Sequence, residues 1–80
     1  MKIIDKTIKM LYNLGYSVYS SRVDYKEENS YRLEIEKGNI EFDVIGKNNH
    51  WETMIGPPTL TPYPSFSTLN EALDYGFENT

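Results

Sequence analysis

The stretch YRLEIEKGNIEFDVI, residues 31–45, decides the fold. Polar and apolar residues alternate on both sides of Gly38-Asn39, a dipeptide suited to a two-residue hairpin turn. We therefore predict two antiparallel strands, because period-two alternation is typical of a sheet with one buried face. The apolar pairs that this turn places on one face are Leu33 with Val44 and Ile35 with Phe42.

The other face of the hairpin carries carboxylates in directly opposed positions. The same register pairs Glu36 with Glu41 and Glu34 with Asp43, and like charges opposite each other cost up to about 1 kcal/mol per pair. Four interpretations are open: a solvated face damped by neighbouring arginines, a docking surface for a basic partner, a mimic of nucleic-acid phosphates, or a divalent-cation site. A calcium loop needs a spaced series of oxygen ligands, and the sequence shows none.

A helix is expected before the hairpin and another after it. Ile4, Ile8 and Leu11 recur at helical spacing within residues 3–14, and Gly15 suits the left-handed position that ends a helix. Lysines at positions 2, 6 and 9 line the outer side of this first helix. The second helix begins after a capping box, Thr68 to Glu71, and its apolar residues are Leu69, Ala72, Leu73, Gly76 and Phe77.

Two more strands complete the predicted sheet. Residues 50–55 form the fourth strand, with Ile55 opposite Phe42 and Trp51 covering Gly46. Residues 16–25 form the first strand, with Tyr19, Val23 and Tyr25 towards the core and Ser20, Arg22 and Asp24 outward. The expected fold class is therefore α+β within a single domain, residues 1–80: an N-terminal helix, a four-stranded antiparallel meander and a C-terminal helix, with both helices on one sheet face.

Composition narrows the function classes. The chain has 80 residues, no cysteine, one histidine and a net charge of −4. Without cysteine there is no thiol catalysis or thiolate metal site, and one histidine cannot build a histidine-rich metal site. The negative charge argues against direct binding to nucleic acid or to an anionic membrane, since both need a basic surface. We expect no enzyme activity, no metal and no cofactor.

The proline-rich segment 56–64 predicts a stiff connection rather than a strand or helix. Its prolines lack the P-x-x-P spacing of a polyproline recognition motif. If Tyr63 and Phe66 are exposed, this segment is a candidate contact site. An alternative places a small-molecule pocket between the sheet and this segment, lined by these two residues with Trp51 and Tyr75.

In size, acidity and helix–sheet–helix layout the chain resembles small phage-encoded inhibitors, including some anti-CRISPR proteins. The resemblance implies a protein-interaction module that inhibits a host nucleic-acid enzyme, such as a CRISPR nuclease. The sequence shows neither a membrane-spanning apolar run nor a signal-peptide core, so we expect the protein in the cytoplasm. We expect a monomer or weak homodimer that binds a basic surface of another protein. The candidate partner-binding residues are Asp24, Glu34, Glu36, Glu41, Asp43 and Glu52.

Overall fold

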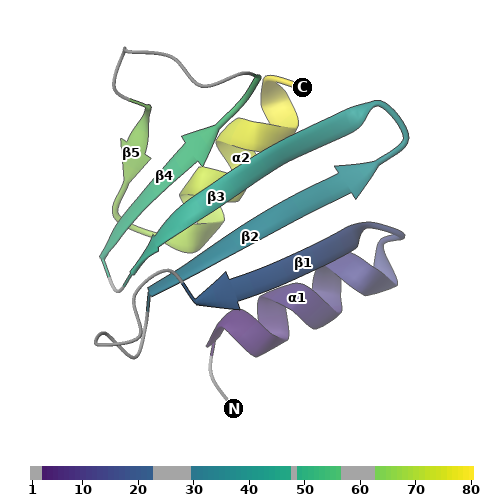
Figure 1. Ribbon diagram of the computed structural model, residues 1–80, viewed down its shortest axis with the longest axis horizontal. Helices are drawn as coiled ribbons and strands as arrows, with labels where there is room; N and C mark the ends of the chain where they lie inside the picture. The colour runs from purple at the N-terminus through teal and green to yellow at the C-terminus, as the bar shows by residue number, and fades with distance from the viewer. Residues whose placement is uncertain (1–2, 23–29, 48, 57–62) are drawn as a thin grey trace.

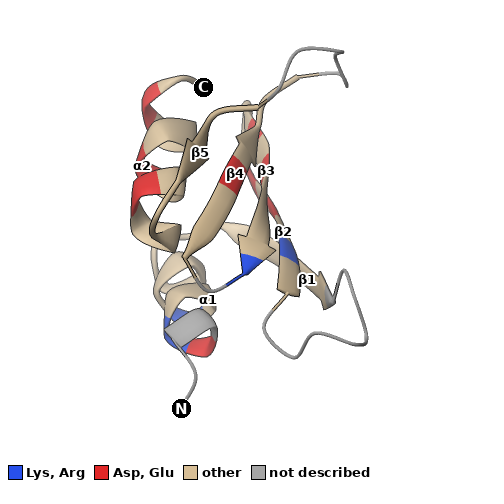
Figure 2. Cartoon of the chain, turned by 90° about the vertical axis from the view of Figure 1, so that its left-hand side faces the viewer, with Lys and Arg blue, Asp and Glu red and all other residues tan. Residues whose placement is uncertain are grey.

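The computed structural model describes residues 3–22, 30–47, 49–56 and 63–80, and it confirms the α+β class (Figure 1). One antiparallel sheet has the strand order β1-β2-β3-β4-β5. Both helices pack on the same face of this sheet, and no described helix or strand covers the opposite face (Figures 1 and 2). The elements are α1 (Ile3–Asn13), β1 (Ser17–Arg22), β2 (Ser30–Lys37), β3 (Ile40–Lys47), β4 (His50–Met54), β5 (Ser65–Phe66) and α2 (Leu69–Glu78).

The predicted β2–β3 hairpin is confirmed pair by pair. Lys37 pairs with Ile40 across the turn, and Gly38 adopts the positive φ of 60° that this tight turn requires. The register also sets Leu33 opposite Val44 and Ile35 opposite Phe42, and all four side chains are buried. Burial of one face fixes the register, because a slip of one residue would turn these side chains to solvent.

The β3–β4 pairing is confirmed in part. Trp51 lies opposite Gly46, where an added Cβ would stand 2.2 Å from the carbonyl oxygen of His50. The bare backbone of Gly46 therefore makes room for β4 and its tryptophan. The strand ends at Met54, one residue earlier than expected, so the predicted pairing of Ile55 with Phe42 is not part of the ladder.

The predicted orientation of the first strand is wrong. Val18 is opposite Ile35 and buried, whereas Tyr19 is opposite Glu34 and 61% exposed. The backbone of Arg22 pairs with Tyr31, in the alternation that includes Val18. Val23, Asp24 and Tyr25 lie outside the described residues.

The end of α1 is held by its own backbone and by the sheet. Gly15 has a φ of 92° and, with Tyr16, donates to the last carbonyls of the helix, as in a Schellman motif. The Tyr12 hydroxyl donates to the carbonyl of Val18 at 2.8 Å, which ties the helix to the outermost strand. Leu11 of α1 is fully buried.

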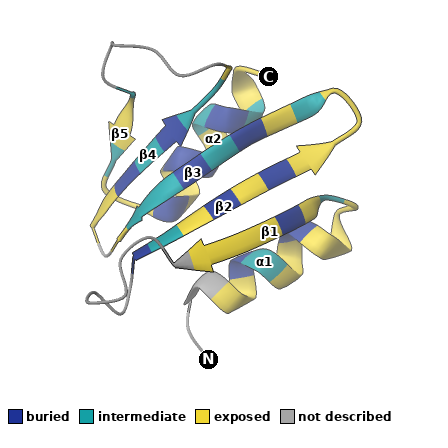
Figure 3. Cartoon of the chain, in the orientation of Figure 1, coloured by how far each residue is buried: buried dark blue, intermediate teal, exposed yellow. Residues whose placement is uncertain are grey.

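The other helix, α2, follows the predicted cap. The amide of Glu71 donates to the Thr68 hydroxyl oxygen at 3.2 Å. At Gly76 the helix approaches β3 so closely that an added Cβ would stand 2.2 Å from the ring of Phe42. The buried residues form one core between helices and sheet (Figure 3): Leu11, Val18, Leu33, Ile35, Phe42, Val44, Trp51, Leu69, Ala72 and Leu73.

A fifth strand was not expected from the sequence. Ser65 and Phe66 pair with Glu52 and Trp51, and they extend the sheet beyond β4. Thr53, 1% exposed, donates its backbone amide to the Pro64 carbonyl at 3.1 Å and its hydroxyl to the Ala72 carbonyl at 2.7 Å. These bonds join β4 to the neighbouring segment and to α2. Residues 57–62 of the proline-rich segment lie outside the described part of the chain.

Candidate functional site

The uncovered side of the sheet, here called the outer face, holds five of the six predicted partner-binding residues. They alternate with the buried residues of β2, β3 and β4, and most of them are exposed. Asp24 lies outside the described residues. The outer face comprises the carboxylates Glu34, Glu36, Glu41, Asp43 and Glu52 together with Tyr19, Arg32, Ile45, Lys47, His50 and Met54.

At the centre of the outer face, one arginine neutralises part of the carboxylate row. Arg32 donates its Nε to Asp43 Oδ2 at 3.0 Å and its Nη2 to the same oxygen. The hydrogen bond and charge of Asp43 raise the pKa of Arg32 above its usual value. The Arg32 Nε also lies 3.7 Å from Glu34 Oε1. Asp43 and Glu34 are thus already engaged by a cation of the same chain.

At the hairpin end, the opposed pair Glu36–Glu41 has no such partner. Both side chains are exposed, and no ion pair to either is present among the described residues. The neighbouring Lys37 turns to the other face, where its Nζ donates to the carbonyl of Leu14 at 2.8 Å and lies 4.9 Å from the ring centroid of Tyr16. This lysine caps the carboxyl end of α1 and leaves the two glutamates uncompensated.

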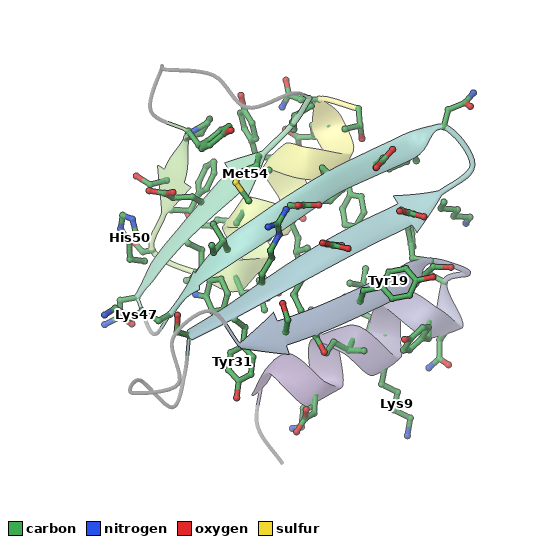
Figure 4. The ribbon with its side chains drawn as sticks, viewed as in Figure 1. Lys9, Tyr19, Tyr31, Lys47, His50 and Met54 are labelled. Atoms are coloured by element: carbon green, nitrogen blue, oxygen red, sulfur yellow. The ribbon has the colours of Figure 1, made fainter. Side chains whose placement is uncertain are left out.

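The opposite end of the outer face carries Lys47 and His50. These two residues are paired across the β3–β4 turn and lie together at the edge of the sheet in Figure 4. His50 Nε2 is 3.3 Å from Glu52 Oε1, so Glu52 has a hydrogen-bond partner within the chain. The outer face is therefore polarised, acidic at the hairpin turn and mixed near the β3–β4 turn.

Apolar groups also lie on the outer face, and two of them, Ile45 and Tyr19, were not expected there from the sequence. Met54, labelled on β4 in Figure 4, lies opposite Asp43 in the ladder, and the half-buried Ile45 lies opposite Glu52. Tyr19 adds an exposed ring on β1. The alternation of residues 50–55 does place Met54 outward, and the hairpin register could have placed Ile45 in the same way. Tyr19 could not be placed, because Val18 beside it also suits a buried position.

The two predicted loop contacts are both half-buried. Phe66 pairs with Trp51 in the ladder, and its ring centroid lies 5.4 Å from that of Tyr75. Phe66 is thus packed against the core rather than presented at a tip. Tyr63 precedes β5 and has an intermediate exposure. The alternative small-molecule pocket involves residues 57–62 as well, which lie outside the described chain.

Comparison with known proteins returned no matching family model, no matching curated protein and no matching solved structure. Among the described residues, no group of three or more histidine, aspartate or glutamate side chains is placed to hold a metal ion. Neither described helix has the length and apolar character needed to cross a membrane. The geometry of the outer face is therefore the basis for assigning a function.

Proposed function

We propose that this chain is a non-enzymatic protein-interaction module whose outer face binds a basic surface of a partner protein. The observation that supports this proposal is the exposed Glu36–Glu41 pair at the hairpin end. The register forces these carboxylates together, and the nearest lysine in sequence, Lys37, is bound to α1. A cation supplied by a partner would relieve the repulsion between the two carboxylates. The free energy that this repulsion costs the folded chain would then favour binding.

The apolar groups beside the carboxylates fit the same proposal. A protein interface needs more than charge, because exposed ion pairs contribute little by themselves. The half-buried Ile45 and Met54 offer apolar contact on the outer face, and Tyr19 offers an aromatic side chain of the kind enriched at interfaces. The proposed partner therefore presents arginines or lysines beside an apolar patch.

The partner class that we favour is a host nucleic-acid enzyme such as a CRISPR nuclease, met in the cytoplasm. Such enzymes carry strongly basic surfaces where they hold the phosphate backbone. An acidic module on that surface would compete with nucleic acid. A phage or mobile element is the source that this proposal implies.

The test is affinity capture with matched charge variants. Wild type, Glu36→Gln/Glu41→Gln and the control Asp5→Asn/Glu78→Gln are used as bait in lysate of the source organism or its host. Both double variants raise the net charge by two, but Asp5 and Glu78 are exposed on the helices rather than on the outer face. We expect a basic partner to be retained by wild type and control and lost by the Glu36/Glu41 variant and at high salt. Equal retention by all three baits would refute the assignment.

A further inference from the structure

The two helices of the layer differ in charge: the ionisable residues Asp5, Lys6 and Lys9 give α1 a net charge of +1, and Glu71, Asp74 and Glu78 give α2 a net charge of −3. Figure 2 shows both basic and acidic positions on α1 and acidic positions on α2. On α1 the exposed lysines are Lys6 and Lys9, and on α2 the exposed carboxylates are Glu71, Asp74 and Glu78. None of these five forms an ion pair within the described chain.

Apolar side chains lie on the flank of α1 that faces α2. Met10 and Leu14 are one helical turn apart and therefore share a side, and they are 46% and 56% exposed. Tyr12 points to the other flank, because its hydroxyl binds Val18 on the outermost strand. Met10 and Leu14 thus turn inward along the layer. The backbones of α1 and α2 do not contact each other in the described residues, so this apolar pair stays uncovered.

We propose that two copies of this chain associate face to face through their helix layers about a two-fold axis. Figure 1 shows α1 and α2 running in broadly the same direction behind the sheet. A two-fold axis along that direction, between the helices, sets α1 of one copy against α2 of its partner, and the reverse. Lysines then meet carboxylates on both sides, while Met10 and Leu14 lie near the axis and meet their own equivalents.

The charges favour this arrangement over a second one, in which the two-fold axis lies in the same plane but runs across the helices. An axis across the helices would set α1 against α1 and α2 against α2, so that like charges would oppose each other. The selected arrangement gives an apolar centre with a charged rim, the usual anatomy of a protein interface. It also leaves the outer face of each copy free, so a dimer would present two acidic surfaces on opposite sides.

The test is a charge swap followed by sedimentation equilibrium over a range of protein concentrations. Lys9→Glu or Asp74→Lys alone should weaken dimerisation about tenfold or more, because each reversal occurs twice in a two-fold interface. The double variant Lys9→Glu/Asp74→Lys should restore association towards the wild-type constant. Glu41→Lys, on the outer face, matches the charge change of Asp74→Lys and should leave dimerisation unchanged.

The outcomes are decisive in both directions. Loss in the single variants with recovery in the double variant supports the helix-layer dimer. A wild-type chain that stays monomeric at millimolar concentration overturns the proposal. So does a dimer that Glu41→Lys weakens as much as Asp74→Lys does, or one that the double variant fails to restore. Circular dichroism of each variant confirms that the fold is retained, since all three positions are exposed.

Discussion

Replacement of Gly76 by alanine tests the close approach of α2 to Phe42 in the core. The new Cβ would stand 2.2 Å from Phe42 Cε2 and 2.5 Å from Cδ2 and Cζ, far inside contact distance. The ring has no free space to enter, because Phe42 is 2% exposed and packs edge-on against Phe77 at 5.2 Å between centroids. Overpacking of this kind costs about 1–3 kcal/mol, and a tighter clash costs more.

The gain in helix propensity offsets part of that cost. Alanine is favoured over glycine in a helix interior by roughly 1 kcal/mol. We therefore expect Gly76→Ala to lower the free energy of unfolding by about 2 kcal/mol net. In a domain of this size that corresponds to a fall in melting temperature of about 10 °C.

The assay is urea denaturation followed by circular dichroism, with two companion variants. Asn70→Ala, at an exposed position of the same helix, should change stability by less than about 0.5 kcal/mol. Phe42→Leu replaces the ring by a smaller side chain and so makes room for a Cβ at position 76. The Phe42→Leu/Gly76→Ala double variant should therefore lose less stability than the sum of the two single losses. A Gly76→Ala protein as stable as wild type would refute the close approach of α2 to β3.

Three further variants test the contacts around the site. Lys37→Met removes the lysine cap on α1 and the cation above the Tyr16 ring, and a loss of about 1 kcal/mol is expected by urea denaturation; an unchanged midpoint would contradict the cap. Thr53→Val removes a buried hydroxyl donor to α2 and should also lower the free energy of unfolding by about 1 kcal/mol. Thr53→Ser keeps a hydroxyl group and should retain more of this hydrogen bond. Glu36→Gln/Glu41→Gln should stabilise the fold by up to about 1 kcal/mol at low salt and by almost nothing at about 1 M salt. A less stable double variant would show that the two carboxylates do not repel each other.

The hairpin was predictable because three independent signals agree there. The alternation, the Gly38-Asn39 turn and the burial of one face all specify the same register. The positions of Glu36 and Glu41 follow from that register alone. Local sequence thus predicted that these residues of β2, β3 and β4 share one face of the sheet.

The predicted orientation of the first strand was wrong for a physical reason. Val18 and Tyr19 are adjacent, so one of them must face the core and the other solvent. Tyrosine suits either side because its ring is apolar and its hydroxyl can remain in water. The spacing of Tyr19, Val23 and Tyr25 favoured an inward position for Tyr19. The packing of Val18 in the core, which is a tertiary contact, shows that Val18 is the buried residue of the two.

Long-range contacts explain what else the sequence could not show. The hydrogen bond from Lys37 to the Leu14 carbonyl joins two residues that are 23 positions apart in sequence. It forms only because α1 ends close to the β2–β3 turn in space. The two-residue β5 is too short for any periodicity to be visible. The uncompensated state of Glu36 and Glu41 is therefore a result of tertiary structure, although their pairing is local.

The Tyr12 hydroxyl bond to Val18 has a consequence for how this protein meets other chains. An outermost strand exposes backbone amides and carbonyls that can template a further strand from another molecule, which is a route to aggregation. The described part of β1 before Arg22 has no charged residue and no proline to discourage this. Tyr12 occupies one of the carbonyls and brings α1 against the strand. Tyr12 therefore leaves fewer backbone groups at the sheet margin available to pair with another chain. Contacts with other proteins are then expected through side chains, whose charges can select the partner.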